Sequence, residues 1–256
     1  MDRSVHKTPF NHARSNLKLV TSSTCSGNTA CEDCSVRHIA MCSALDTKQV
    51  QQLADISTDF KRDARQILCS EGDPADYLYN IREGCVRISK MLPDGRRQIT
   101  GFLFPGDFFG LACKDVYTFT AEAISPVDMC RFPRKKIARL FSEMPELGER
   151  VFEMTSTELE AAHDQMLLLG RKTASEKLCS FLLAMAEKSA LRTPRAADHV
   201  HLPMSRSDIA DYLGLTVETV SRQFTKLAKA GLIKLEGAHD VHLLDRDALA
   251  DMAEGD

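Results

Sequence analysis

The sequence has no long apolar run near its start. Its first 24 residues are polar, with charged or histidine side chains from Asp2 to Arg14. A secretory signal needs an apolar stretch of about 7–15 residues, and a membrane-spanning helix needs about 20. The sequence therefore predicts a cytoplasmic protein without a membrane partner.

Common enzyme motifs are also missing. The chain has no G-x-x-x-x-G-K phosphate loop and no nucleophile elbow, and its eight histidines show no metalloenzyme spacing. These absences predict that the protein is not an enzyme. Positive charge is not in excess either, because the formal net charge is -3. This total argues against non-specific coating of nucleic acid but leaves room for a local DNA-binding module.

Cysteine, by contrast, is plentiful. Nine cysteines, an odd number, are spread from Cys25 to Cys179. In the reducing cytoplasm such a set is a poor disulfide framework. Three of them, Cys31, Cys34 and Cys42, lie within the segment CEDCSVRHIAMC. A C-x2-C pair is typical of half a zinc site, and clustered cysteines with one distant partner also suit an iron–sulfur cluster. The spacing by itself leaves both kinds of site open.

The middle of the chain has the pattern of a β barrel or roll. At 256 residues the chain is long enough for two domains. Residues 46–60 have the apolar spacing of a short amphipathic helix. Between about residues 66 and 133, short apolar runs alternate with turn signals. The clearest predicted hairpin is MLPDGRRQI, because Pro93 presets the turn and Gly95 accepts a positive φ.

A helical period follows from Pro145 to about Leu169. One apolar stripe, Leu147, Val151 and Met154, suits packing on the chain's own barrel. A second stripe, with the alternating steps of a coiled-coil seam, consists of Gly148, Phe152, Thr155, Leu159, Ala162, Met166 and Leu169. The second stripe predicts self-association, although one wide core-facing stripe would also explain both sets.

Helix signals continue after this seam. Gly170 is predicted to end the long helix, and Thr173 with Glu176 forms a capping box for another helix over about 174–191. The polar stretch RTPRAADH then has the composition of a linker.

The last sixty residues contain the segment SRSDIADYLGLTVETVSRQFTKLAKAGLI. Ser205 and Thr216 are the predicted N-caps of two helices, the second continuing to about Lys229. Gly214 lies where the turn is expected, and Ala210 and Val220 have the spacing at which the two helices of a helix-turn-helix pack together. The segment LIKLEGAHDVHLL then predicts a β hairpin, or wing.

Five polar residues of the second helix are the predicted DNA-binding residues: Glu218, Ser221, Arg222, Lys226 and Lys229. Arginine can bond guanine at two points, glutamate can accept from cytosine, and serine can bond a base or a phosphate. An ordinary solvated helix would also carry such charges. The caps, the turn glycine and the wing in one register favour DNA binding.

A β roll, a long dimer helix and a winged helix-turn-helix, in that order, resemble the Crp/FNR transcription regulators from about residue 25 onward. The stretches DIADYLGLTVETVSR, QITGFLFPGD, HDQMLLLGRKTASEKL and CEDCS resemble the FNR branch. The C-x2-C-x7-C spacing is most similar to FnrN, FnrL and oxygen-responsive FixK-type proteins, whereas the enterobacterial FNR has a shorter final gap. The implied fold is α+β, with a cysteine segment (1–45), a β-roll sensor domain (46–143), a dimerisation helix (144–170) and a winged helix-turn-helix domain (171–256).

The resemblance implies a four-iron, four-sulfur (4Fe-4S) cluster held by Cys31, Cys34, Cys42 and one distant cysteine. In the FNR branch that ligand lies in a segment like AISPVDMCRFP, which corresponds to Cys130 here. The remaining cysteines are interpreted as the free thiols Cys25 and Cys113 and the small core residues Cys69, Cys85 and Cys179.

The resemblance also implies a function. It indicates an oxygen-responsive activator whose cluster promotes homodimerisation and binding to a TTGAT-N4-ATCAA-like palindrome under low oxygen. RNA polymerase is the implied further partner, contacted in part by the turn from Pro93 to Arg97.

A regulator of the same fold that binds a cyclic nucleotide is the main rival. Such a pocket uses an arginine for the phosphate and a glutamate for the ribose. Here no arginine lies between Arg97 and Arg131, and Leu111 follows Gly110 where the cyclic AMP receptor has glutamate. The β roll is therefore expected to lack the residues that bind a cyclic nucleotide. A different small-molecule effector or a structural zinc site is the remaining alternative.

Overall fold

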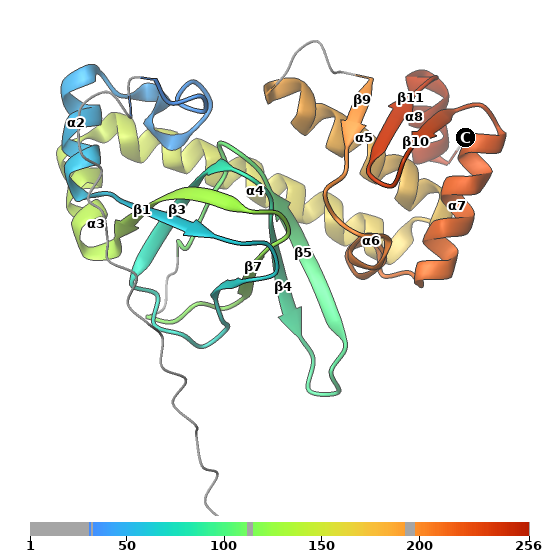
Figure 1. Ribbon diagram of the computed structural model, residues 1–256, viewed down its shortest axis with the longest axis horizontal. Helices are drawn as coiled ribbons and strands as arrows, with labels where there is room; N and C mark the ends of the chain where they lie inside the picture. Colours follow the sequence, from blue (N-terminus) through green and yellow to red (C-terminus); the bar gives the residue numbers. More distant parts are fainter. Residues whose placement is uncertain (1–30, 32, 112–114, 193–197, 256) are drawn as a thin grey trace, which may run out of the picture.

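A computed structural model describes residues 31, 33–111, 115–192 and 198–255 of the protein. A β-roll lies at one end and a winged helix at the other, and the long helix α4 (Pro145–Arg171) runs past both (Figure 1). Within these residues, no helix has the length and apolar character needed to cross a membrane. The mixture of helices and sheets confirms the predicted α+β class.

Two four-stranded antiparallel sheets form the β-roll. The first has the order β1 (Thr58–Arg62), β8 (Val127–Pro133), β3 (Tyr77–Glu83) and β6 (Phe108–Phe109). The second has the order β2 (Ile67–Cys69), β7 (Thr120–Ala123), β4 (Val86–Met91) and β5 (Arg97–Leu103). Aromatic side chains occupy the core between the sheets, where Tyr79 stacks on Phe109 with ring centroids 4.8 Å apart.

The predicted hairpin is confirmed by the pairing of β4 with β5. In its turn, the amide of Leu92 donates to the carbonyl oxygen of Arg96 at 2.8 Å. Gly95 has a φ of +87°, in the left-handed region that favours glycine. The hairpin projects away from the body of the β-roll (Figure 1).

Short helices cover one end of the β-roll. They are the 3-10 helix η1 (Met41–Ala44), α2 (Thr47–Ile56) and α3 (Arg134–Glu143). Asp46 and Gln49 form a capping box that starts α2. The helix predicted over 46–60 is thus shorter than expected, because β1 begins at Thr58 and pairs with β8, a strand distant in sequence. Helix α3 was not predicted.

The winged helix contains α5 (Ala174–Arg192), β9 (His199–His201), α6 (Arg206–Leu213), α7 (Val217–Lys229), β10 (Ile233–Glu236), β11 (Asp240–Leu243) and α8 (Arg246–Glu254). Ser205 and Thr216 cap α6 and α7 as predicted, and Gly214 turns between them with a φ of +61°. Strand β10 pairs with β11, which confirms the wing. The sequence predicted neither β9, a third strand of this sheet, nor α8.

The long helix ends slightly later than predicted. Gly170 lies inside α4, and the chain leaves the helix only at Lys172, which is extended. Glycine can adopt helical angles at a cost of about 1 kcal/mol relative to alanine, so a glycine alone does not end a helix. The capping box of α5 is confirmed, since the amide of Thr173 donates to Glu176 at 3.0 Å.

We expect Gly84→Ala to destabilise the β-roll strongly. Gly84 has a φ of +87°, and an added Cβ would lie 2.2 Å from the carbonyl oxygen of Pro126. Gly72 has a similar φ of +90° with nothing within 4 Å, so Gly72→Ala isolates the backbone strain. The free energy of unfolding, measured in urea, should fall by about 1 kcal/mol for Gly72→Ala and by about 3 kcal/mol or more for Gly84→Ala. Equal losses would mean that the backbone at Gly84 relaxes around the clash.

Candidate metal centre and nucleic-acid interface

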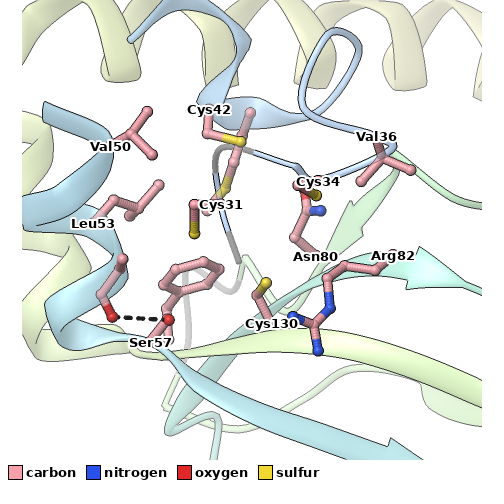
Figure 2. Close-up of a pocket in the computed structure, with 13 residues that line it drawn as sticks. Cys31, Cys34, Val36, Cys42, Val50, Leu53, Ser57, Asn80, Arg82 and Cys130 are labelled. Atoms are coloured by element: carbon pink, nitrogen blue, oxygen red, sulfur yellow. Dashed lines mark hydrogen bonds between the residues drawn. The ribbon is translucent and has the colours of Figure 1, made fainter. Parts of the chain in front are cut away.

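All four cysteines predicted to bind metal line one cavity. Cys31, Cys34 and Cys42 come from the N-terminal segment, and Cys130 comes from β8. Figure 2 shows their side chains arranged around the same space. The fold therefore brings together cysteines that are far apart in sequence. Cys25 and Cys113 lie outside the described residues, while Cys69, Cys85 and Cys179 are buried, in agreement with their interpretation as core residues.

The rest of the cavity wall is mainly apolar. Its other lining residues are Val36, Met41, Val50, Leu53, Ala54, Ser57, Asn80, Arg82 and Phe132. The side-chain oxygen of buried Asn80 accepts no hydrogen bond from the described part of the chain. Thiols in an apolar wall are the environment that iron–sulfur clusters and structural zinc share.

The cavity is small in this conformation, at about 30 Å³. In addition, no three histidine, cysteine or acidic side chains among the described residues form a group that could hold a single metal ion. Four thiols facing one apolar space match the donor set of a cluster.

Burial raises the pKa of three of the four cavity thiols, those of Cys31, Cys42 and Cys130. It raises the pKa of Cys42 to about 11, and the neighbouring Cys34 adds to this shift. Burial also raises the pKa of Cys130, an effect that Arg82 opposes and the other three cysteines reinforce. Because thiolates are the metal-binding form, loading this site must release protons.

Arg82 places a fixed positive charge in the cavity wall. Its Nε donates to Asp128 at 3.1 Å, and its Nη2 donates to Asp59 at 2.8 Å. Although burial disfavours its charge, Cys130 and the two carboxylates raise the pKa of Arg82. Neither Arg82 nor Asn80 was among the site residues predicted from the sequence. The available signal was a polar residue, Asn80, within the apolar run YLYNI, and a charged residue, Arg82, directly after it.

The cysteine segment packs directly on α4. Met41 and Leu45 share a buried cluster with Leu147 and Val151 of the helix. Arg150 adds a polar contact, because its Nη2 donates to the carbonyl oxygen of Ile39 at 3.0 Å. The predicted barrel-facing stripe of α4 is therefore confirmed, and it also contacts the segment that carries three of the cysteines.

The second stripe of α4 faces away from the subunit. Phe152, Leu159 and Met166 are 73%, 58% and 61% exposed, and Thr155 and Ala162 are exposed too. A single core-facing stripe is therefore the wrong interpretation of these residues. Leu169 differs, because it packs against the core of its own winged helix, near Gly214.

Helix α7 presents the predicted DNA-binding face to solvent. Glu218, Ser221, Arg222, Lys226 and Lys229 are all exposed. On the opposite side, Val220, Phe224 and Leu227 are buried in the domain core. The guanidinium of Arg222 donates to Thr219 Oγ1 at 3.4 Å in the first turns of the helix. An exposed polar face near the N-terminus of the second helix is the arrangement that enters a major groove.

Comparisons with known proteins agree with this architecture. A model of the cyclic nucleotide-binding domain matches residues 60–144, and a model of the Crp-like helix-turn-helix domain matches residues 176–252. The nitrogen fixation regulation protein FixK of Bradyrhizobium diazoefficiens is 44% identical over 205 residues, which are 80% of this chain and 86% of that protein. The chain belongs to the Crp/FNR family of transcription regulators.

Other members of the family support the same assignment. The transcriptional activator protein FnrL of Cereibacter sphaeroides is 38% identical over 229 residues, covering 88% of this chain and 92% of that protein. The solved structure of FixK2 from Bradyrhizobium japonicum superposes with a TM-score of 0.72 at 39% identity, covering 77% of this chain and 96% of that one. The chain is thus a DNA-binding transcription activator of the FNR/FixK type and not an enzyme, and Crp/FNR proteins are dimers.

We expect Arg150→Ala to loosen the cysteine segment from α4. The change removes the hydrogen bond to Ile39, which contributes about 1 kcal/mol or more because the donor is charged. Hydrogen–deuterium exchange across residues 36–45 should accelerate about five- to tenfold, since each 1.4 kcal/mol is a factor of ten. Arg139→Ala, at an exposed arginine of α3, is the matched control and should leave this exchange unchanged. Equal exchange in both variants would assign no anchoring role to Arg150.

Proposed function

We propose that this regulator responds to oxygen through a 4Fe-4S cluster ligated by Cys31, Cys34, Cys42 and Cys130. The observation that carries the proposal is the single cavity lined by these four cysteines. The segment that supplies three of them packs, through Met41 and Leu45, on the helix that exposes an apolar stripe. A bound cluster would supply an oxygen-reactive iron centre. Four thiolates are the usual ligand set of such a cluster, whereas a structural zinc ion would require the same four sulfurs to converge on one point.

The protein's own residues would link this site to association. In the proposed working division, the cysteine segment (1–45) and sensor domain (46–143) act on the dimerisation helix (144–170), which orients the DNA-binding domain (171–256). The cysteine segment contacts the inner stripe of α4 through Met41 and Leu45. A ligand that holds this segment in place stabilises whichever state of α4 it contacts best, and loss of the ligand removes that stabilisation.

The proposed target is a TTGAT-N4-ATCAA-like palindrome bound by a homodimer, with RNA polymerase contacted in part by the turn from Pro93 to Arg97. The exposed stripe of α4 supports the homodimer. Apolar side chains as exposed as Phe152 and Met166 are buried when two helices pair, and removing them from water favours association. The names of FixK and FnrL, a nitrogen fixation regulator and a transcriptional activator, are consistent with gene activation.

Binding of a cyclic nucleotide between the sheets is disfavoured on physical grounds. Tyr79 and Tyr117 are 4% and 3% exposed within the β-roll core, and the hydroxyl of Tyr117 donates to the carbonyl oxygen of Tyr77 at 2.7 Å. Side chains thus occupy the described part of this interior. The match to a cyclic nucleotide-binding domain is therefore interpreted as a statement about fold.

We expect serine at any one of the four cavity cysteines to abolish the cluster, because each supplies one thiolate ligand. After anaerobic reconstitution, iron and sulfide should fall to background in the Cys31, Cys34, Cys42 and Cys130 variants. Cys25→Ser and Cys113→Ser are the controls and should retain full iron and sulfide. A Cys130→Ser protein with full content would exclude Cys130 as a ligand, and stoichiometric zinc in the native protein would exclude the cluster.

We expect Leu159→Glu to weaken the dimer at least tenfold. Two like charges would face each other across a two-fold axis, and the exposed apolar contact would be lost. Anaerobic sedimentation of the cluster-loaded protein measures this change. Ala161→Glu places the same charge on the same exposed helix but off the stripe, so it should leave the dimer intact. An unchanged Leu159→Glu dimer would show that the stripe does not mediate association.

We expect Arg222→Ala to weaken DNA binding and to flatten the preference for guanine. A bidentate contact of arginine with guanine discriminates by about 1–3 kcal/mol per half-site. Glu218 is assigned to a cytosine and Ser221 to a thymine. Titrations against the palindrome and against a variant changed at each guanine measure the preference. If Arg222→Ala loses affinity equally for both while keeping the parent's preference, Arg222 contacts phosphate instead.

Lys226 and Lys229 are the comparison residues on the same helix. We expect alanine at either position to weaken binding to all sequences alike and to reduce the salt dependence of binding, because phosphate contacts release counterions.

A further inference from the structure

Ion pairs join the β4–β5 hairpin to the first helix of the helix-turn-helix. The side chain of Arg97 contacts Asp208 at 3.0 Å and Asp211 at 2.7 Å. Arg87 contacts Asp208 as well, and its other terminal nitrogen lies 2.7 Å from Glu122 of β7. Two arginines of the sensor domain thus meet two aspartates of the DNA-binding domain. We call Arg87, Arg97, Asp208 and Asp211 the interdomain clasp.

Asp208 uses its two carboxylate oxygens for different purposes. Oδ2 accepts from the amide of Ser205 at 3.0 Å and from its hydroxyl at 2.7 Å, which completes the capping box of α6. Oδ1 accepts from Arg87 and Arg97. The Asp208 side chain is only 6% exposed, so its charge depends on these arginines for compensation. The start of the helix-turn-helix is therefore coupled to the sensor sheet.

An apolar contact lies beneath the clasp. Ile99 and Phe102 of β5 are 0% and 2% exposed, within the same buried cluster as the core of the winged helix. The ring of Phe102 lies 5.2 Å from that of Tyr212 in α6. The carbonyl oxygen of Tyr212 accepts from Gln98 of β5 at 3.2 Å and from Gln165 of α4 at 2.8 Å. The DNA-binding domain is thus fixed to both the sensor sheet and the long helix.

We propose that the interdomain clasp sets the angle at which each subunit presents α7, so that its four members are positioning residues for palindrome binding. The inference rests on the proposed function, because a dimer binds two half-sites at a fixed spacing only when its two DNA-binding domains have a fixed relative orientation. Without the clasp, the apolar contact and the hydrogen bonds to Tyr212 still hold each DNA-binding domain, but it samples a wider range of orientations. If the two DNA-binding domains of a dimer are in the competent relative orientation about one tenth of the time, the apparent affinity for the palindrome falls about tenfold.

Arg97→Ala tests the clasp on three DNAs: the palindrome with its four-base spacer, the same palindrome with five bases, and a single half-site. We expect palindrome affinity to fall about tenfold and the preference for four over five bases to shrink, with half-site affinity unchanged. Lys90→Ala is the matched control, since Lys90 is on β4 and pairs within the β-roll, with Glu71 at 3.6 Å. An equal loss on the half-site, or no loss on the palindrome, overturns the proposal.

A double-mutant cycle tests the clasp without DNA. Arg97→Ala, Asp211→Asn and the double variant are compared by urea unfolding of the full chain. If the clasp is present, the losses in free energy of unfolding of the two single variants should not add in the double variant, because both single variants break the same ion pair. Additive losses overturn it. If the parent protein shows no preference for the palindrome, the proposed operator is wrong, and the cycle still decides whether the clasp holds.

Discussion

The packing of Met41 and Leu45 against Leu147 and Val151 is the contact on which the rest of the structure depends. It buries the inner stripe of α4 and fixes the segment that carries Cys31, Cys34 and Cys42 over the end of the β-roll. Buried aliphatic side chains each contribute about 1.5–3 kcal/mol, so this cluster supplies much of what holds the segment in place. A displacement of the cysteine segment would therefore disturb its contact with the long helix.

The two faces of α4 then divide its roles. Val151 is buried against the cysteine segment, while the next residue, Phe152, is 73% exposed. A change in the packing of one face alters the position or tilt of the other, because the helix is a single rigid element. This arrangement offers a physical basis for a signal at the cavity to alter association, without any ligand inside the β-roll.

The β-roll is a scaffold whose interior is occupied by its own side chains, many of them aromatic. Its outer parts carry the proposed sensing and positioning functions. Asn80 and Arg82 of β3 face the cysteine cavity, and Arg87 follows shortly along the chain, after the tight turn at Gly84. Strand β3, which lines the cavity, and Arg87, which pairs with Asp208 of the DNA-binding domain, are therefore close in the chain.

The sequence by itself determined the local elements of this protein. Ser205 and Thr216 cap their helices because each side-chain oxygen accepts a hydrogen bond from a backbone amide in the first turn of the helix. Gly214 adopts the left-handed conformation of the turn because it lacks a Cβ. Both effects act over a few residues. Only the tertiary structure decided that Cys130 lies with the N-terminal cysteines, that Leu169 packs inside its subunit, and that Asp208 meets two arginines. These contacts join residues far apart in the chain, where no periodicity or spacing records which side chains will meet.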